Sequence, residues 1–109
     1  MEFDPQLLKG SIALLLLKLL SQRDMYGYEI IREARHRSQD AFQFKEGTLY
    51  PALHQLEKRG LLRAEWRVGE NGRERKYYAA TAKGRKAALQ RERDWASFIR
   101  AVNAVLTTG

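Results

Sequence analysis

The 109-residue chain contains no cysteine, two histidines and only two prolines. The absence of cysteine excludes disulfide bonds, thiolate zinc sites and cysteine nucleophiles. His36 and His54 have no carboxylate at a recognisable metal-binding spacing, so we expect no metal site and no cofactor. The sequence also lacks a nucleophile–base pair and a glycine-rich phosphate loop. We therefore expect a protein that is not an enzyme.

Long hydrophobic runs are missing as well. The most apolar stretch, SIALLLLKLL at residues 11–20, is too short to span a bilayer and contains Lys18. No basic segment precedes it and no small-residue cleavage site follows it, so we expect no signal peptide. These features indicate a cytoplasmic protein without a membrane segment.

Positive charge, by contrast, is in excess. Twenty lysines and arginines against thirteen acidic residues give a formal net charge of +7. Such a balance favours an anionic partner, with nucleic acid first and an anionic membrane surface second. The membrane alternative would use the basic residues beside the apolar stripe of the last predicted helix. These are Lys83, Arg85, Lys86, Arg91 and Arg93.

Apolar residues at helical spacing predict three helices in the first part of the chain. Asp4 and Pro5 begin the first, a leucine-rich helix with apolar residues on more than one face, which we expect to contact two surfaces. The segment 25–39 predicts a shorter helix whose apolar stripe begins at Tyr28. A third helix is predicted at about 47–59, with Pro51 in its first turn.

After Gly60, which suits a left-handed helix end, the period changes from helical to alternating. Residues 61–68 alternate apolar and charged side chains, so we expect a half-buried strand with Trp66 and Val68 on its buried face. Asn71-Gly72 is a hairpin signal, so RKYYAA at residues 75–80 is the expected returning strand. Thr81 then caps a last helix that runs nearly to residue 109.

Three helices followed by a hairpin indicate a winged helix-turn-helix, so the predicted fold class is mainly α with a small β-hairpin wing. Residues 1–80 form the expected DNA-binding domain and residues 81–109 a long C-terminal dimerisation helix. About 25 residues at about 1.5 Å each reach nearly 40 Å, which is too long a stripe for so small a domain to bury. We expect the stripe and the first helix to pair with a second copy. The expected homodimer interface comprises Leu8, Ile12, Leu89, Trp95, Phe98, Ile99, Val102 and Leu106.

Five motifs in order carry a family resemblance: YGYEI at 26–30, GTLYPAL at 47–53, LEKRGLL at 56–62, RKYY at 75–78 and TAKG at 81–84. Together they resemble the PadR family of bacterial transcriptional regulators, in its short branch with a single C-terminal helix. The resemblance implies a homodimeric repressor that binds a palindromic operator and is released by an effector. Ala80 departs from the leucine or isoleucine often found there and leaves a smaller side chain under the last helix.

The candidate DNA contacts come from the third helix and the hairpin. With Leu49, Leu53 and Leu56 facing inward, the polar side of the helix is left for the major groove. Cations of the wing suit phosphates or the minor groove. The expected DNA-binding residues are Thr48, Tyr50, Pro51, His54, Gln55 and Lys58 on the helix, Arg73, Arg75 and Lys76 on the wing, and Tyr26 and Lys45 at the flanks. The alternative is a solvated polar helix face and hairpin charges that prevent edge aggregation.

Trp95 lies mid-stripe on the last helix, where a two-fold axis can bring two copies together. Family members that sense flat hydrophobic drugs resemble this chain in placing a tryptophan here. The resemblance thus implies a small aromatic effector, with Trp95, Phe98 and Leu15 as candidate contacts. The alternative is that these aromatic residues are plain interface anchors.

The function that we expect is sequence-specific binding of double-stranded DNA by a homodimeric repressor. Two alternatives stay open. One is a multidrug-sensing repressor that binds planar aromatic compounds between subunits. The other is a winged-helix module that docks a protein or RNA through its basic face.

Overall fold

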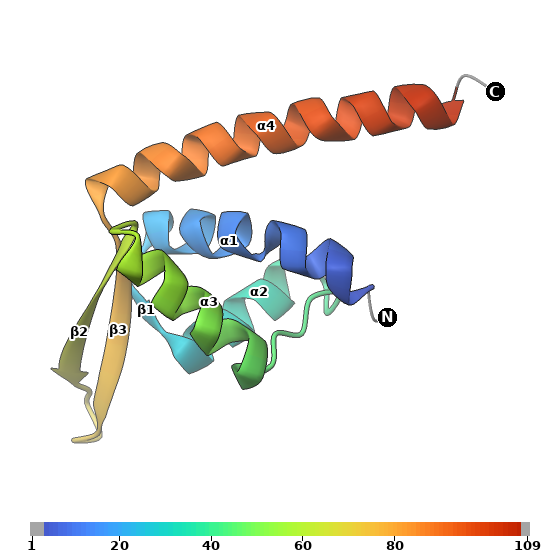
Figure 1. The fold of residues 1–109 in the computed structure, drawn as a ribbon. Coiled ribbons are helices and arrows are strands. Elements are labelled where there is room, and N and C mark those ends of the chain that lie inside the picture. Colours follow the sequence, from blue (N-terminus) through green and yellow to red (C-terminus); the bar gives the residue numbers. More distant parts are fainter. Residues whose placement is uncertain (1–3, 108–109) are drawn as a thin grey trace.

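The computed structural model describes residues 4–107. In chain order the elements are α1 (Pro5–Gln22), β1 (Met25–Tyr26), α2 (Gly27–Arg37), α3 (Glu46–Lys58), β2 (Leu62–Val68), β3 (Glu74–Ala80) and α4 (Ala82–Thr107). Figure 1 shows α1, α2 and α3 gathered beside the base of the hairpin, with α4 lying along the other side of α1. The predicted winged helix-turn-helix with a long last helix is confirmed.

Local hydrogen bonds explain where the helices begin and end. The Asp4 carboxylate accepts from the Gln6 N–H at 2.8 Å and caps α1. Gly60 has φ +76° and turns the chain away after α3. The Thr81 hydroxyl oxygen accepts from the Gly84 N–H at 3.0 Å and donates to the Gly60 carbonyl at 2.7 Å. Thr81 thus caps α4, as expected from the sequence, and it also ties the start of α4 to the end of α3.

The hydrophobic core lies between the three short helices and the base of the sheet. Leu16, Leu17 and Leu20 of α1 are buried, and they belong to one apolar cluster with Leu53 and Tyr78. Helix α1 has the core on one side and α4 on the other (Figure 1). The expectation that this leucine-rich helix contacts two surfaces is confirmed, and part of its second face is covered by the same chain.

The sheet has three antiparallel strands in the order β1-β3-β2. The hairpin between Gly60 and Thr81 was expected, and its turn contains Gly72 at φ +75°. Strand β1 was not expected, because it consists only of Met25 and Tyr26 and is too short to show an alternating pattern. Its pairing of Tyr26 with Tyr77 attaches the hairpin to the start of α2.

Three expectations about burial and helix position were wrong. Trp66 and Val68 are 66% and 67% exposed, because the outer half of the hairpin extends beyond the helices that cover its base (Figure 1). Tyr28 is 62% exposed instead of lying in the apolar stripe of α2. Pro51 lies inside α3, in its second turn, because the helix begins at Glu46.

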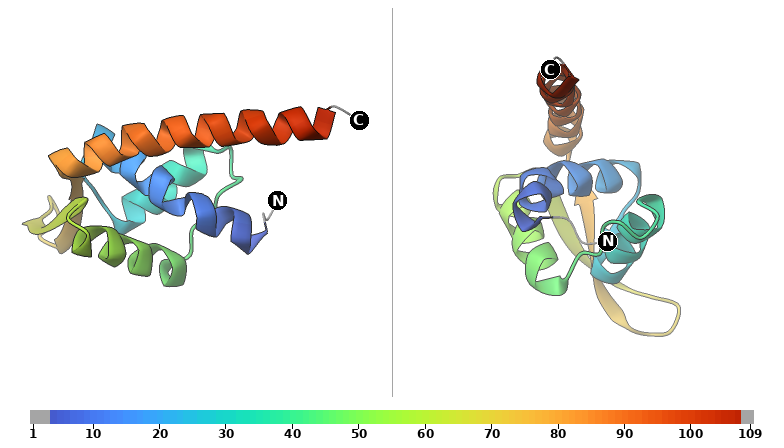
Figure 2. Two further views of the ribbon diagram at one scale, coloured as in Figure 1. Left: turned by 45° about the horizontal axis from the view of Figure 1, so that its top comes forward. Right: turned by 90° about the vertical axis from the view of Figure 1, so that its right-hand side faces the viewer.

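Helix α4 leaves the domain after its first turns. Its buried residues are Gly84 and Ala88, both near its start. The rest of α4 continues as a single helix past the other elements (Figure 2). With α4 included, the molecule measures 59 × 31 × 20 Å. Among residues 4–107, no helix combines the length and hydropathy that a membrane span requires.

Candidate nucleic-acid interface

One side of α3 is core and the other is open. Leu49, Leu53 and Leu56 are buried, at 0%, 0% and 2% exposure. These positions recur every three or four residues, so they form one stripe of the helix. The expected groove-facing residues Thr48, Pro51, His54, Gln55 and Lys58 are all exposed.

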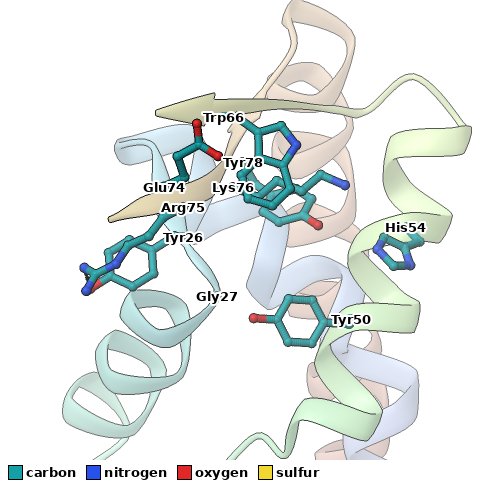
Figure 3. Close-up of a pocket in the computed structure, with 9 residues that line it drawn as sticks. All are labelled: Tyr26, Gly27, Tyr50, His54, Trp66, Glu74, Arg75, Lys76 and Tyr78. Carbon is teal, nitrogen blue, oxygen red and sulfur yellow. Dashed lines mark hydrogen bonds between the residues drawn. The ribbon is translucent and has the colours of Figure 1, made fainter. Parts of the chain in front are cut away.

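The wing, α3 and the start of α2 line an open pocket of about 350 Å³ (Figure 3). It brings together side chains that are far apart in the sequence. Those expected to contact DNA are Tyr26, Tyr50, His54, Arg75 and Lys76. The remaining lining residues are Gly27, Trp66, Glu74 and Tyr78. Among the other expected DNA contacts, Lys45 is the exposed N-cap residue of α3 and Arg73 is exposed at the hairpin turn.

Tyr50 is half-buried because its ring lies against Gly27. A β-carbon at residue 27 would come within 2.8 Å of the ring carbon Cζ of Tyr50 and closer still to its hydroxyl oxygen. Glycine at this position therefore leaves room for the aromatic ring of the helix opposite. The contact holds the Tyr50 side chain toward the pocket, where its hydroxyl is drawn facing the start of α2 (Figure 3).

Two arginines of the wing bind the body of the protein. The Arg75 guanidinium lies 4.4 Å from the centroid of the Tyr26 ring and donates to its hydroxyl. Arg67 pairs with Asp24 at 2.8 Å and lies 4.7 Å from the centroid of the Tyr77 ring. Hydrogen bonds to Asp24 and then to Glu65 raise the pKa of Arg67. These contacts give Arg75, and Tyr26 with it, a structural role in positioning the wing.

The remaining cations divide between bound and open groups. Lys76 lies over the Tyr78 ring, with Nζ 5.6 Å from its centroid. On α2, Arg37 donates to Glu33 at 2.8 Å, and this hydrogen bond lowers the pKa of Glu33. Arg32 lies 5.6 Å from the centroid of the exposed Tyr28 ring. The positive charge of α2 is therefore partly neutralised, whereas Lys45 and Lys58 at the two ends of α3 are exposed.

Sequence reasoning missed Trp66 as a member of this surface. The alternating pattern assigned it correctly to the face shared with Ala64, and that face is core at the base of the hairpin. It becomes open surface farther out. The available signal was position along the strand, because Trp66 lies nearer the hairpin turn than the base.

The expected dimer and effector residues lie mostly on the open part of α4. Trp95 and Phe98 are 40% and 59% exposed, with ring centroids 6.0 Å apart. Ile12 is different: at 8% exposure it belongs to the core of its own chain. Other expected interface residues on α4 that are exposed are Leu89, Ile99 and Leu106. Half-buried members of the two expected sets are Leu8, Leu15 and Val102.

The sequence is similar to a known family and to proteins of two bacteria. Residues 16–90 match the model of the transcriptional regulator PadR-like family. The chain is 38% identical over 85 residues to the transcriptional regulator Rv3488 of Mycobacterium tuberculosis, covering 78% of this chain and 75% of that protein. It is 34% identical over 90 residues to an uncharacterised protein of Lysinibacillus sphaericus, covering 83% of each.

Solved structures are similar over nearly the whole chain. A transcriptional regulator from Clostridium thermocellum superposes with a TM-score of 0.83 at 32% identity, covering 91% of this chain and 96% of that one. A PadR family transcriptional regulator from Eggerthella lenta has the same TM-score of 0.83 at 30% identity, covering 95% of this chain and 88% of the other.

Proposed function

The chain belongs to the PadR-like family of transcriptional regulators, and from this premise we propose that it is a homodimeric repressor of a palindromic operator. In this proposal residues 1–80 bind DNA, residues 81–109 pair two chains, and a small molecule releases the complex. The ends of these two units, residues 1–3 and 108–109, lie outside the described residues. Since its partner is DNA, the proposed site of action is the cytoplasm.

The observation that supports the DNA-binding assignment is the joint surface of α3 and the wing. The helix presents Thr48, His54 and Gln55 on its exposed side, and hydroxyl, imidazole and amide groups can hydrogen-bond to base edges. Lys45, Lys58 and Lys76 add cations around it, and cations pair with phosphates whatever the base sequence. Tyr50 contributes its hydroxyl from a ring held against Gly27.

The open stripe of α4 supports the dimer. Phe98, Val105 and Leu106 are 59%, 75% and 73% exposed on a helix that extends past its own domain. Exposed apolar side chains arranged along one helix are typical of a partner surface, and a second copy pairs the same stripe with itself. On α1, Leu7 is 63% exposed and replaces Ile12 in the proposed interface, because Ile12 is used by the core.

Mobility-shift titration against duplexes selected by the protein from a random library tests the DNA-binding proposal. Thr48→Ala and His54→Ala are expected to weaken binding to the selected duplex while the chain still sediments as a dimer. A protein that binds selected and scrambled duplexes equally would contradict the repressor assignment and favour a protein- or RNA-docking module. A monomer at micromolar concentration in sedimentation would contradict the interface.

A drug-sensing repressor is the second candidate, and the exposed aromatic pair Trp95 and Phe98 favours it. A two-fold axis near this pair brings four aromatic side chains together, and such faces stack on planar ligands of many shapes. Titration of a Trp66→Phe dimer, in which Trp95 is the one tryptophan left in each chain, with chemically varied planar dyes is expected to quench its fluorescence. If emission stays flat for all of them, Trp95 and Phe98 are interface anchors only.

A further inference from the structure

Trp66 is a large apolar side chain that the fold leaves in solvent. The register of the hairpin pairs Ala64 with Tyr78 and Trp66 with Lys76. Side chains alternate along a strand, so these two pairs point to the same face of the wing. Tyr78 is 1% exposed and closes the core, whereas Trp66 is 66% exposed two positions farther out. Burial in the domain therefore does not account for the tryptophan.

This face of the wing is turned toward α3. Trp66 and Lys76 line the same pocket as Tyr50 and His54 (Figure 3), with the first two on the wing side and the other two on the helix side. The space is open, about 350 Å³ in volume. Trp66 thus faces the region between the two elements that are proposed to contact DNA.

A duplex places a particular chemical group in that region. When a helix lies in the major groove and a hairpin flanks it, the sugar–phosphate strand at the groove edge passes between them. This strand presents phosphate anions and the apolar faces of deoxyribose rings. Lys76 supplies a cation, and Trp66 supplies an apolar surface with one N–H donor. Glu74 also lines the pocket, and its carboxylate repels phosphate, so the phosphate is favoured at the end of the pocket beside Lys76.

From this arrangement we propose that Trp66 packs against a deoxyribose of the DNA strand that crosses between α3 and the wing, with Lys76 pairing the adjacent phosphate. The proposal rests on the proposed function and specifies a contact within it. Neither group reads a base edge, so the contact strengthens binding to every sequence equally. The group that fills the pocket in this proposal is the sugar–phosphate strand of the same duplex whose major groove α3 enters.

The test compares Trp66→Ala with Val68→Ala, an exposed position on the same strand face that lies nearer the turn and outside the pocket lining. The probes are a duplex selected by the wild-type protein and a scrambled duplex of the same composition. Trp66→Ala is expected to weaken binding to both about tenfold, because the apolar surface of one large side chain is no longer buried against the sugar. Trp66→Phe should lose less, and Val68→Ala should stay within about twofold, as surface changes usually do.

Salt dependence separates the two partners of the contact. Lys76→Ala is expected to reduce the slope of log affinity against log salt by about one, because one phosphate contact is lost. Trp66→Ala should leave that slope unchanged. Fluorine NMR of protein labelled with fluorotryptophan gives a direct reading of the side chain. Its two tryptophan signals are assigned with Trp66→Phe, and the Trp66 signal is expected to shift with either duplex.

The outcomes are distinguishable. Unchanged affinity in Trp66→Ala together with an unmoved Trp66 signal overturns the contact while the regulator assignment stands. A loss confined to the selected duplex overturns it too, because Trp66 would then read sequence. Failure of the wild-type protein to bind any duplex refutes the proposed function and the contact together. Circular dichroism checks that each variant is folded, and if Trp66→Ala is not, the phenylalanine variant and the NMR signal decide.

Discussion

Replacing Gly84 with alanine is expected to displace the start of α4 from the corner where α3 meets β2. A β-carbon at residue 84 would lie 2.9 Å from the carbonyl carbon of Leu61 and nearer still to its oxygen. The oxygen is the closer of the two atoms, and real β-carbons essentially never come within 3.0 Å of another heavy atom, so the helix or the Leu61 backbone must move by about 1 Å at least. Backbone at this corner is tied on both sides, since Thr81 N–H donates to the Leu61 carbonyl at 3.1 Å and Lys83 Nζ to the Arg59 carbonyl at 3.0 Å.

The expected loss is the difference between two opposing effects. Overpacking a closed site costs about 1–3 kcal/mol. Removing a glycine from a helix recovers about 0.5–1 kcal/mol. Because backbone atoms cannot rotate away as a side chain can, we place the overpacking cost of Gly84→Ala at the upper end of that range. The free energy of unfolding should therefore fall by about 2 kcal/mol.

Two other glycines provide controls for the same substitution. Gly10 in α1 and Gly47 in the first turn of α3 have open space where a β-carbon would stand. Gly10→Ala and Gly47→Ala are therefore expected to leave stability unchanged or raise it by up to about 1 kcal/mol. Urea unfolding at one fixed protein concentration measures all three, because the stability of a dimer depends on concentration. A Gly84→Ala protein as stable as the Gly10→Ala protein would refute the reasoning from close approach.

Three further predictions concern single side chains. Thr81→Ala removes the cap of α4 and the hydrogen bond to the Gly60 carbonyl, and should lower the free energy of unfolding, measured in urea, by about 1–2 kcal/mol. Thr81→Ser keeps the hydroxyl and should retain most of the wild-type stability. Burial, followed by the charges of Glu57 and Tyr50, raises the pKa of Tyr78 above its ordinary 10.0, so the folded state keeps the phenol proton to a higher pH than the unfolded state does. The free energy of unfolding, measured in urea, should therefore fall as pH rises above 10.0. In Tyr78→Phe, which has no phenol proton to lose, that fall should be less steep. The hydrogen bond from Arg37 lowers the pKa of Glu33 below its ordinary 4.5, so its contribution is present above that value and is lost on acidification; thermal melts of Glu33→Gln should show a flatter acid limb.

The site was predictable where local pattern determines exposure. Leucines three and four residues apart on α3 identified its buried stripe, and so predicted that Thr48 and His54 lie on the open side. The roles of Arg75 and Tyr26 were not predictable in this way. Their contact joins β3 to β1, and a two-residue strand shows no periodicity from which the pairing could be inferred.

The close approaches were equally invisible in the sequence. Gly27 and Gly84 read as ordinary glycines near helix starts. The structure shows the Tyr50 ring against one and the Leu61 carbonyl against the other. Which atoms lie opposite a glycine depends on how the elements pack in three dimensions, so the pattern of residues along the sequence does not reveal them.

By itself, the sequence determined the order of helices and hairpin, their caps at Asp4 and Thr81, and the family, because these depend on periodicity and on hydrogen bonds between residues close in the chain. Only the tertiary structure decided which alternating residues of the wing are core and which are surface. The pleat sets the face of Trp66, but burial requires another element to cover that face. The helices cover only the base of the hairpin, and this leaves the tryptophan exposed on the side of α3.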